Sequence, residues 1–471
     1  MPVVPENFSS SLAPHTQRLL VLGLGVSGFA AAELALRDGF EVWVLDAAAG
    51  AVREDRASLL EGRGATVLLD WDGAPALPSA SMVVISPGIP PGSLLGQVAE
   101  RCDCPVLGEL EWGYLHCHCP VLAVTGTNGK TTTVEMTSHC LQQAGWSAPV
   151  AGNIGVPLSQ AARRSASLDC LVVEVSSYQL ERVERFTPLA SALLNISADH
   201  LDRYASLEAY AAAKARLLEQ SVASRAVVVR HDLLAHPLVS PHLTALTDRL
   251  FTFSTGNSDA TLHLAPSGTV RHASPRGSGA KDLFAMDKVR FIGQHNAENA
   301  MAALGLCAAV GLPVEQAAHH IETYVPSPHR LETVAQHNGV RVINDSKSTN
   351  PDSMARALEA VGNADAPRVL LIAGGLDKDL DFSVVTPVLG ALVRQVFLIG
   401  SCKHRLASLW DGTVLCRCCP SLESATNAAL DAATSGDTVL LSPGCASQDM
   451  FANYAERGTV FGNFVRRRLP E

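Results

Sequence analysis

One short segment has the residue types of a phosphate-binding loop. Residues 124–132 read VTGTNGKTT, after an apolar strand-like run and before a helix-like stretch. Small residues leave backbone N–H groups open to phosphate oxygens, a lysine can hold the β and γ phosphates, and a hydroxyl can ligate Mg²⁺. Gly126, Gly129, Lys130 and Thr131 supply these groups, although Val124 stands where a Walker A loop has its first glycine. A strand-to-helix turn that binds no phosphate is the alternative.

Acidic residues follow two later apolar runs. Glu174 comes directly after CLVV, where a P-loop enzyme places a carboxylate that ligates Mg²⁺. The segment NISADHLDRY places Asp199, His200 and Asp202 just past another expected strand. This group could bind a second cation or orient a substrate, and Asp199 could instead cap a helix.

A second glycine-rich loop lies near the N-terminus. Residues 23–28 read GLGVSG, a full G-x-G-x-x-G between a strand and a helix, and Asp46 ends the next expected strand. In a dinucleotide-binding unit the glycines let the backbone approach a diphosphate, and the acid binds ribose hydroxyls. Both NAD and a UDP-sugar fit this pattern, and a tight turn that needs glycine for packing is the remaining alternative.

Three alternations of short aliphatic runs with helical stretches position these loops. The first begins with RLLVLGLG and FEVWVLD, the second with PVLAVTG and CLVVEVSS, and the third with VRVINDS and RVLLIAGG. This is the βαβ rhythm of parallel sheets, and a chain of 471 residues is long enough for about three domains. We therefore predict an α/β protein with domains at residues 1–117, 118–326 and 327–471.

Composition narrows the class of protein. The formal net charge of -10 argues against a nucleic-acid-binding surface, which is normally basic. The most apolar segment, from Leu19, is soon followed by Glu33 and continues into a strand, so we predict no signal peptide, no membrane span and a cytoplasmic location. The twelve cysteines include Cys-x-Cys pairs between Cys102 and Cys119, a spacing that favours free thiols over a zinc site.

The motifs, taken in chain order, resemble a known family. The sequence contains GTNGKTTT, GNIGVPL, EVSSYQLE, NISADHLDRY, a lysine in AYAAAKARLLE, GQHNAENAMAAL, PHRLE and NDSKSTNPDS. This order is similar to that of the Mur ligases, ATP-dependent amide-forming ligases of peptidoglycan precursor synthesis, whose own loop lacks the first Walker glycine. GLGVSG, GGLDKDLDF and SPGCASQDMFANYAERG further resemble the members that add D-glutamate to UDP-N-acetylmuramoyl-L-alanine.

The resemblance implies a fold and a reaction. It implies an N-terminal Rossmann-like UDP-binding domain, a central P-loop-type ATPase domain with a parallel sheet, and a C-terminal Rossmann-like domain that binds glutamate. ATP would phosphorylate the alanyl carboxylate, and the amine of glutamate would attack the acyl phosphate. Positioning and charge neutralisation dominate phosphoryl transfer, so such a site needs cations above all. We expect two Mg²⁺ ions and a monomer.

The resemblance also assigns residues to roles. Catalysis would depend on Lys130, Asn153, His200 and Lys214, the last carbamylated by CO₂, with Thr131, Glu174, His200 and Lys214 as metal ligands. The ATP site would comprise Gly126, Thr127, Asn128, Gly129, Lys130, Thr131, Thr132, Asn296, Asn299, Arg330 and Asp345. The UDP-substrate site would comprise Gly25, Val26, Ser27, Asp46, Ser86, Pro87 and Gly88. Glutamate would contact Lys347, Thr349, Lys378, Ser447 and Tyr454, because lysines and hydroxyls suit a dicarboxylate.

Some positions depart from the family pattern. Ala47, Ala48 and Ala49 follow Asp46 where many relatives have Thr-Arg, and Gly444 and Gln448 replace an alanine and an apolar residue. The motifs do not separate D- from L-glutamate. Three rival readings remain: a nicotinamide dehydrogenase, which explains only the first domain; a non-catalytic nucleotide-binding module; and a folate polyglutamate ligase, which shares only the central domain.

Overall fold

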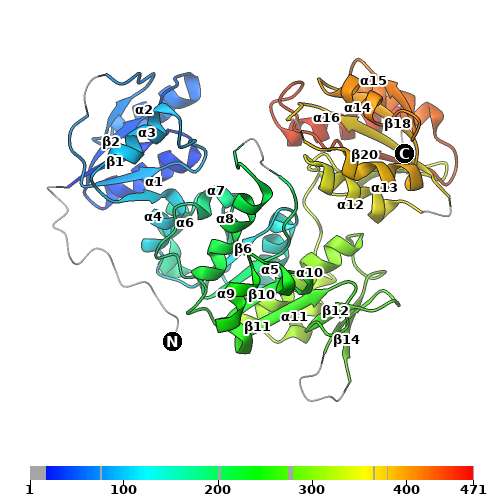
Figure 1. Ribbon diagram of the computed structural model, residues 1–471, viewed down its shortest axis with the longest axis horizontal. Helices are drawn as coiled ribbons and strands as arrows, with labels where there is room; N and C mark the ends of the chain where they lie inside the picture. Colours follow the sequence, from blue (N-terminus) through cyan, green and yellow to red (C-terminus); the bar gives the residue numbers. More distant parts are fainter. Residues whose placement is uncertain are drawn as a thin grey trace.

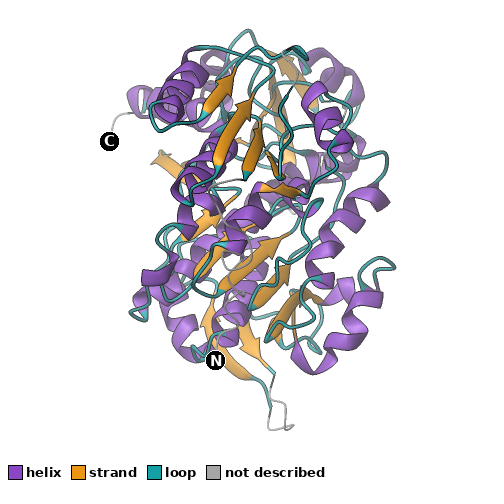
Figure 2. Ribbon diagram, turned by 90° about the vertical axis from the view of Figure 1, so that its left-hand side faces the viewer, coloured by secondary structure: helices purple, strands orange, loops and turns teal. Residues whose placement is uncertain are grey.

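Three sheets, each formed by one stretch of chain, organise the molecule. The computed structural model describes residues 17–74, 77–199, 203–273, 279–363, 366–378 and 380–469. In Figure 1 the unit around β1 and the unit around β20 lie at opposite sides above the central unit around β6. Figure 2 shows helices covering the strands from both sides, as in an α/β protein. The predicted α/β class is therefore confirmed, and the domain boundaries, which fall between the sheets, stay a prediction.

The first sheet is parallel throughout and has the strand order β3-β2-β1-β4-β5. Leu19, Val21 and Val44 from its strands pack against Ala31 and Leu34 of α1 in a buried core. Its strands are β1 (Arg18–Leu22), β2 (Glu41–Leu45), β3 (Thr66–Leu68), β4 (Met82–Ile85) and β5 (Val106–Gly108), and its helices are α1 (Val26–Arg37), α2 (Ala51–Glu61), α3 (Leu94–Arg101) and α4 (Glu109–Leu115).

The central sheet has nine strands in the order β14-β13-β12-β11-β10-β9-β6-β8-β7. β13 pairs antiparallel with both β12 and β14, and we did not predict this hairpin extension because its strands are short and mix polar with apolar residues. The strands are β6 (Val121–Thr125), β7 (Val150–Gly152), β8 (Leu171–Glu174), β9 (Ala190–Leu193), β10 (Ala226–Arg230), β11 (Leu250–Ser254), β12 (Leu262–Leu264), β13 (Thr269–His272) and β14 (Lys281–Ala285). The helices are α5 (Lys130–Gln143), α6 (Leu158–Ala162), α7 (Ser177–Leu180), α8 (Leu207–Glu219), α9 (Ser240–Leu243), α10 (Gln294–Ala309) and α11 (Val314–Ile321).

The third sheet has the order β15-β16-β20-β17-β18-β19, with only β15 antiparallel to its neighbour. The strands are β15 (Glu332–His337), β16 (Val340–Asn344), β17 (Val369–Gly374), β18 (Val393–Ile399), β19 (Leu415–Cys418) and β20 (Thr438–Leu441). The helices are α12 (Pro351–Val361), α13 (Thr386–Leu392), α14 (Lys403–Leu409), α15 (Leu422–Ala432) and α16 (Tyr454–Arg468). The strand predicted from RVLLIAGG is β17, which is buried along its whole length.

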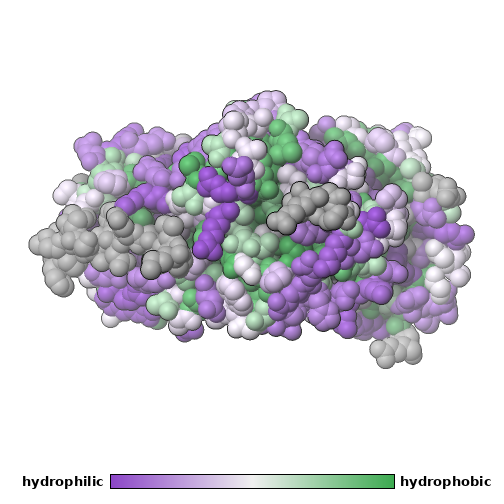
Figure 3. All heavy atoms as spheres, turned by 90° about the horizontal axis from the view of Figure 1, so that it is seen from below, coloured by the Kyte–Doolittle hydropathy of each residue, from purple (hydrophilic) through white to green (hydrophobic). Residues whose placement is uncertain are grey.

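The molecular surface is mostly polar. Hydrophilic side chains cover most of the face shown in Figure 3, with smaller apolar areas near its middle. Among the helices that the structure describes, none combines the length and the apolar character needed to cross a bilayer.

Candidate functional site

The loop between β6 and α5 is shaped by glycine and filled by lysine. Gly129 has a φ of 86°, and a Cβ there would lie 2.1 Å from Asn299 Oδ1 of α10, so only glycine fits. Lys130 begins α5, and its Nζ donates to the carbonyl oxygens of Gly126 at 2.9 Å and Thr127 at 2.8 Å. Burial lowers the pKa of Lys130, although the negative charge of Glu174 opposes this effect. The first N–H groups of α5 have no acceptor within the helix, so the loop combines a cation with open N–H donors.

Strand pairing brings an acid to this loop. β8 lies between β6 and β7, so that Glu174 is paired in register with both Val124 and Gly152. Glu174 is 2% exposed, and its Oε2 accepts from Thr131 Oγ1 at 2.6 Å, while its Oε1 accepts from Asn153 Nδ2 at 2.7 Å. The Thr131 hydroxyl and the Asn153 amide, which we predicted in different roles, thus both contact the Glu174 carboxylate.

Lys214 approaches the same loop from α8 and is almost fully buried, at 1% exposure. Its Nζ donates to Gly126 O at 2.8 Å, the carbonyl that also accepts from Lys130, and lies 4.4 Å from the centre of the Tyr210 ring. Burial, and then the charge of Lys130, hold the pKa of Lys214 well below its usual value. A lysine on an alanine-rich helix is ordinarily a surface residue, so the interior position of Lys214 is unusual.

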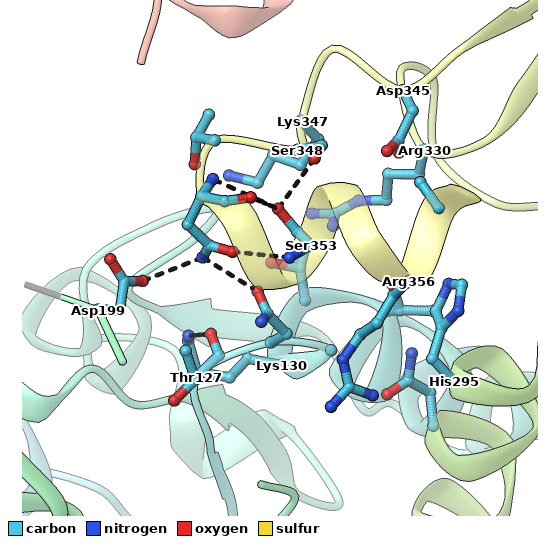
Figure 4. A pocket seen from close by; sticks show the side chains of 18 of the residues that line it. Thr127, Lys130, Asp199, His295, Arg330, Asp345, Lys347, Ser348, Ser353 and Arg356 are labelled. Atoms are coloured by element: carbon cyan, nitrogen blue, oxygen red, sulfur yellow. Dashed lines mark hydrogen bonds between the residues drawn. The ribbon is translucent and has the colours of Figure 1, made fainter. Parts of the chain in front are cut away.

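The phosphate loop forms one wall of a cavity of about 330 Å³. Figure 4 shows Lys130 and Thr127 on one side, with Arg330, Asp345 and Lys347 opposite them. The sequence-predicted residues that line this cavity are Thr127, Asn128, Gly129, Lys130, Thr131, Thr132, Asn153, Glu174, Asn296, Asn299, Arg330, Asp345, Lys347, Thr349 and Lys378. Residues separated by more than two hundred positions in the chain thus meet around one space.

Titratable groups on the far wall carry altered proton affinities. Burial raises the pKa of Asp345 to about 7, even though its carboxylate accepts from Ser442 Oγ and Leu331 N. Burial also lowers the pKa of Lys347 to about 8, and its Nζ lies 4.1 Å from the centre of the Tyr454 ring. Strongly perturbed groups that share a cleft are typical of functional sites.

Asn350 and Arg356 line the cavity but were not predicted as site residues, and neither was Asp352, which lies beside them on α12. Asn128 Nδ2 donates to Asp352 at 2.5 Å, and Asn350 Nδ2 donates to Asn128 Oδ1 at 3.3 Å and to Asp199 at 3.2 Å. Arg356 pairs with Asp352 at 3.0 Å, one turn along α12. The start of α12 is therefore bonded across the domain boundary to the phosphate loop. Asn350 and Asp352 lie within NDSKSTNPDS, but their residue types also fit an ordinary helix cap, which Asn350 is.

The start of α10 lines another side of the cavity. Asn296 Nδ2 donates to Ile292 O, and Asn299 Nδ2 donates to Asn296 Oδ1 at 3.1 Å. His295, also missed from the sequence, lines the same region, and burial lowers its pKa to about 4. At neutral pH this imidazole is uncharged, so the three side chains present polar groups without a net charge.

The N-terminal glycine loop lies apart from this cavity. Asp46 Oδ2 accepts from Leu24 N at 2.7 Å, and its Oδ1 accepts from Ala48 N at 2.9 Å. Arg53 Nε lies 3.1 Å from Asp46 without hydrogen-bond alignment, and Arg56 donates to Leu24 O, so two unpredicted arginines of α2 flank the loop. The other predicted residues of this region are Gly25, Val26, Ser27, Ser86, Pro87 and Gly88, and Ser86 Oγ donates to Gly23 O at 3.3 Å.

A smaller cavity joins the first and central units. Ser86 and Pro87 line it together with Tyr178 and Arg203. Arg203 makes a bidentate ion pair with Glu181. This places part of the predicted UDP-substrate set against the central domain. Its remaining members, including Gly88, do not line that space.

The other predicted residues fall into three groups. Gly126 belongs to the phosphate loop and Lys214 lies behind it; the Gly126 carbonyl accepts from both Lys130 and Lys214. Ser447 and Tyr454 do not line the cavity, although Tyr454 lies beneath Lys347. His200 and Asp202 lie outside the described residues. In the part of the chain that is described, no three His, Cys, Asp or Glu side chains converge as a metal-binding group.

Comparisons with known proteins agree with this arrangement. Family models described as "Mur ligase middle domain" and "Mur ligase, glutamate ligase domain" match residues 124–307 and 329–445. Proteins named UDP-N-acetylmuramoylalanine--D-glutamate ligase are similar to this chain. The one from Syntrophus aciditrophicus is 36% identical over 96% of this chain and 98% of its own length, and the one from Anaeromyxobacter dehalogenans is 37% identical over 94% and 96%.

Solved structures share the fold. A pseudomurein peptide ligase type C from Methanothermus fervidus matches with a TM-score of 0.60 at 17% identity, covering 96% of this chain and 100% of its own. A MurF ligase from Thermotoga maritima in complex with ADP matches with a TM-score of 0.59 at 15% identity, covering 91% and 96%. Because both family models and the full-length relatives match the domains that form the cavity, the chain belongs to the Mur ligase family.

Proposed function

We propose that the protein is an ATP-dependent ligase that joins D-glutamate to UDP-N-acetylmuramoyl-L-alanine in the synthesis of peptidoglycan precursors. One observation carries the proposal: a phosphate loop from the central domain and the cations Arg330, Lys347 and Lys378 from the C-terminal domain face one cavity. Such a space suits two anionic reactants that must be held together. The relatives named above, similar over nearly the whole chain, supply the identity of both substrates.

The reaction needs charge neutralisation more than a base. The alanyl carboxylate oxygen attacks the γ-phosphorus of ATP, the bond to the β-phosphate oxygen breaks, and ADP leaves. The glutamate amine then attacks the acyl carbon, and the tetrahedral intermediate releases phosphate and loses a proton from nitrogen. Lys130 would hold the β and γ phosphates, and Arg330 would approach them from the other wall. Fixed cations in a site with little water stabilise charge that develops in both transition states.

The acidic side of the cavity fits Mg²⁺. The hydroxyl of Thr131 and the carboxylate of Glu174, 2.6 Å apart, are oxygen donors of the kind that Mg²⁺ prefers, and Asn153 adds an amide. When bound, Mg²⁺ neutralises phosphate charge. We propose two such ions, with His200 and a modified Lys214 contributing to the second.

The modification of Lys214 is chemically reasonable where it lies. A neutral amine, not an ammonium, attacks CO₂, and the environment of Lys214 favours the neutral form. The N–C bond forms, the nitrogen loses a proton, and the resulting carbamate is an anion in place of a cation. We propose that this carbamate replaces the bond from Lys214 Nζ to Gly126 O.

The remaining assignments extend the same proposal. Residues 1–117 would form a Rossmann-like UDP-binding domain, supported by its parallel sheet and by Gly25, Val26, Ser27, Asp46, Ser86, Pro87 and Gly88 around its loop. Residues 118–326 would bind ATP, with Asn296 and Asn299 near adenine. Residues 327–471 would form a second Rossmann-like domain and bind glutamate through Lys347, Thr349, Lys378, Ser447 and Tyr454. We further propose a cytoplasmic monomer.

Phosphate release from ATP tests the proposal. The purified protein is given UDP-N-acetylmuramoyl-L-alanine and Mg²⁺ with D-glutamate, with L-glutamate, or with neither. Release that requires D-glutamate supports the reaction, and preference for L-glutamate keeps the chemistry but changes the specificity. If neither amino acid stimulates release, the substrate assignment is wrong. Titration with NAD(P)H serves as the control for a dehydrogenase, and we expect no binding.

A further inference from the structure

Two buried cysteines meet at the carboxyl end of the C-terminal sheet, in the loops that follow two of its interior strands. Cys402 follows β18, Cys445 follows β20, and they are only 1% and 3% exposed. Their Sγ atoms lie 3.4 Å apart, and both thiols are free. A disulfide requires about 2.05 Å between the sulfurs, so an approach of roughly 1.3 Å would join two residues that are 43 positions apart in the chain.

One thiol lies on a loop that carries a proposed glutamate-binding residue, and the other contacts a second such loop. Cys445 lies two residues before Ser447, and Leu376 N donates to Ala446 O at 2.9 Å, which ties the loop after β17 to the loop after β20. Cys402 N donates to Gly375 O at 3.2 Å in the same β17 loop, which leads to Lys378. A bond between the sulfurs would therefore pull on both loops at once.

Little free space separates these loops. A Cβ at Gly400 would lie 2.5 Å from Gly375 Cα, and a Cβ at Gly375 would lie 2.2 Å from Ala446 O. Arg457 of α16 is 1% exposed and donates to Cys445 O at 3.1 Å and to Ala446 O at 3.3 Å. These two bonds hold the β20 loop in place. Closely packed backbone transmits a displacement instead of absorbing it.

We propose that Cys402 and Cys445 form a reversible thiol–disulfide pair, oxidised by a peroxide, that weakens the use of glutamate by the enzyme. The effect on glutamate rests on the proposed function, whereas formation of the disulfide does not. Because Lys378 and Ser447 lie on the displaced loops, the amino acid site would lose alignment while the phosphate loop of the central domain stays intact.

The redox step balances with hydrogen peroxide as the oxidant. The Cys402 thiol releases its proton, and the thiolate attacks one peroxide oxygen. The O–O bond breaks, the departing hydroxide takes up that proton, and a sulfenic acid and one water result. The Cys445 sulfur then attacks the Cys402 sulfur, the S–O bond breaks, and a second water leaves. The two thiols lose two electrons and two protons in total, and dithiothreitol reverses the change. Contact with Cys445 lowers the pKa of Cys402 and raises that of Cys445, which favours Cys402 as the first to react.

The other cysteines provide an internal contrast. Cys140 and Cys307 also interact, but they lie in the core of the central domain and donate to the carbonyls of Ala317 and Thr137. Cys418 is exposed on β19, and its Sγ lies 3.9 Å from Lys403 O at the start of α14. An exposed cysteine is the expected target of indiscriminate oxidation, so Cys418 shows whether the buried pair responds selectively.

Peptide mapping of the full-length protein tests the pair directly. The protein is treated with hydrogen peroxide, its remaining thiols are alkylated in denaturant, and disulfide-linked peptides are identified by mass spectrometry. We expect a peptide containing Cys402 linked to one containing Cys445, and loss of the link after dithiothreitol. If these peptides stay unlinked when Cys418 is fully oxidised, the pair is not a redox site and the inference is wrong.

Kinetics before and after oxidation test the consequence. We expect kcat/KM for D-glutamate to fall by about 10- to 100-fold and to recover with dithiothreitol, with the KM for ATP unchanged. Cys402→Ala and Cys445→Ala should abolish the reversible response, and Cys418→Ala should retain it. Full linkage with unchanged kinetics overturns the regulatory role. If the reduced protein makes no product from any amino acid, the proposed function fails, while the mapping still decides whether the disulfide forms.

Discussion

The two glycine-rich loops differ in what surrounds them. The loop after β1 has no lysine, and its acid, Asp46, accepts from two backbone N–H groups. At the loop after β6, its own Lys130 and the buried Lys214 of α8 share the Gly126 carbonyl, and an acid, Glu174, contacts a hydroxyl. A loop of the first kind can hold a ligand in place, whereas one of the second kind can also stabilise charge as bonds change.

The difference extends to the neighbouring domains. Asn128 of the β6 loop bonds to Asp352 of the C-terminal domain, so this loop lies at a contact between the central and C-terminal units. The β1 loop is flanked instead by Arg53 and Arg56 of its own domain. We infer that anchoring and chemistry are divided between the two loops, and variants in each should therefore fail in different ways.

Lys130→Ala should produce the largest effect. Removing the only side-chain cation of the loop leaves the β and γ phosphates uncompensated, so we expect phosphate release to fall by about 10³-fold. Binding of UDP, measured by calorimetry, should be unchanged because the β1 loop is untouched. Normal ATP turnover by this variant would remove the loop from the mechanism, and a parallel loss of UDP binding would contradict the division of labour.

Lys214→Ala should reduce activity by about 10²-fold, and short carboxylates should restore part of it. The physical reason is that an added carboxylate can replace the negative charge of a carbamate. Arg216→Ala on the same helix serves as a control for disturbance of α8, since its Nη2 donates to Val183 O away from the loop. Absence of rescue, together with an unmodified Lys214 in the native mass spectrum, would show that the lysine acts only by packing.

Local sequence signals predicted the phosphate loop and its acid because each lies at the end of an apolar strand. VTGTNGKTT follows β6 and Glu174 ends β8, and the parallel register of these strands brings them together. The same reasoning located β1 and β17, whose residues are nearly all apolar. A strand that is buried on both faces has an almost continuous apolar sequence, so it can be located from the sequence alone.

The sequence contains no comparable signal for the contacts between domains. Asp352 and Arg356 occur in a helix whose sequence is that of any amphipathic surface helix, and only tertiary docking turns Asp352 toward Asn128. The strands β13 and β14 were missed because they are short and neither forms a continuous apolar run. The pairing of Cys402 with Cys445 depends on the order of β18 and β20 in the sheet, which sequence periodicity does not specify.

Two glycine variants test whether the β1 loop binds the diphosphate of UDP. A Cβ at Gly28 would lie 1.7 Å from Gly23 O, whereas a Cβ at Gly25 meets nothing within 4 Å. Gly28→Ala should therefore distort the first domain, lower its melting temperature and abolish UDP binding. Gly25→Ala should fold normally and weaken UDP binding by about 10-fold, because its methyl group meets the approaching diphosphate. Unchanged UDP affinity in Gly25→Ala would place the diphosphate elsewhere.

The smallest expected effect concerns Asp345 and stability. Its pKa is raised from 3.8 to about 7, so the folded protein holds this proton more tightly than the unfolded chain does. The stability that this proton provides is fully present below about pH 4 and is lost as the pH rises through about 7. Asp345→Asn removes this dependence, and we expect the variant to gain about 2–4 kcal/mol over the wild type between pH 4 and pH 8.

Thermal melts across that range measure the gain, with the exposed Asp248→Asn as the matched control. The control should follow the wild type at every pH. Parallel curves for Asp345→Asn and wild type would mean that Asp345 is ionised throughout, held by a cation that burial alone does not reveal. A gain confined to high pH would show that the wall opposite the phosphate loop keeps a destabilising acid. A residue that lowers stability is expected at a binding site, where function and stability can conflict. The acid of the β1 loop differs, because Asp46 accepts hydrogen bonds from two backbone N–H groups.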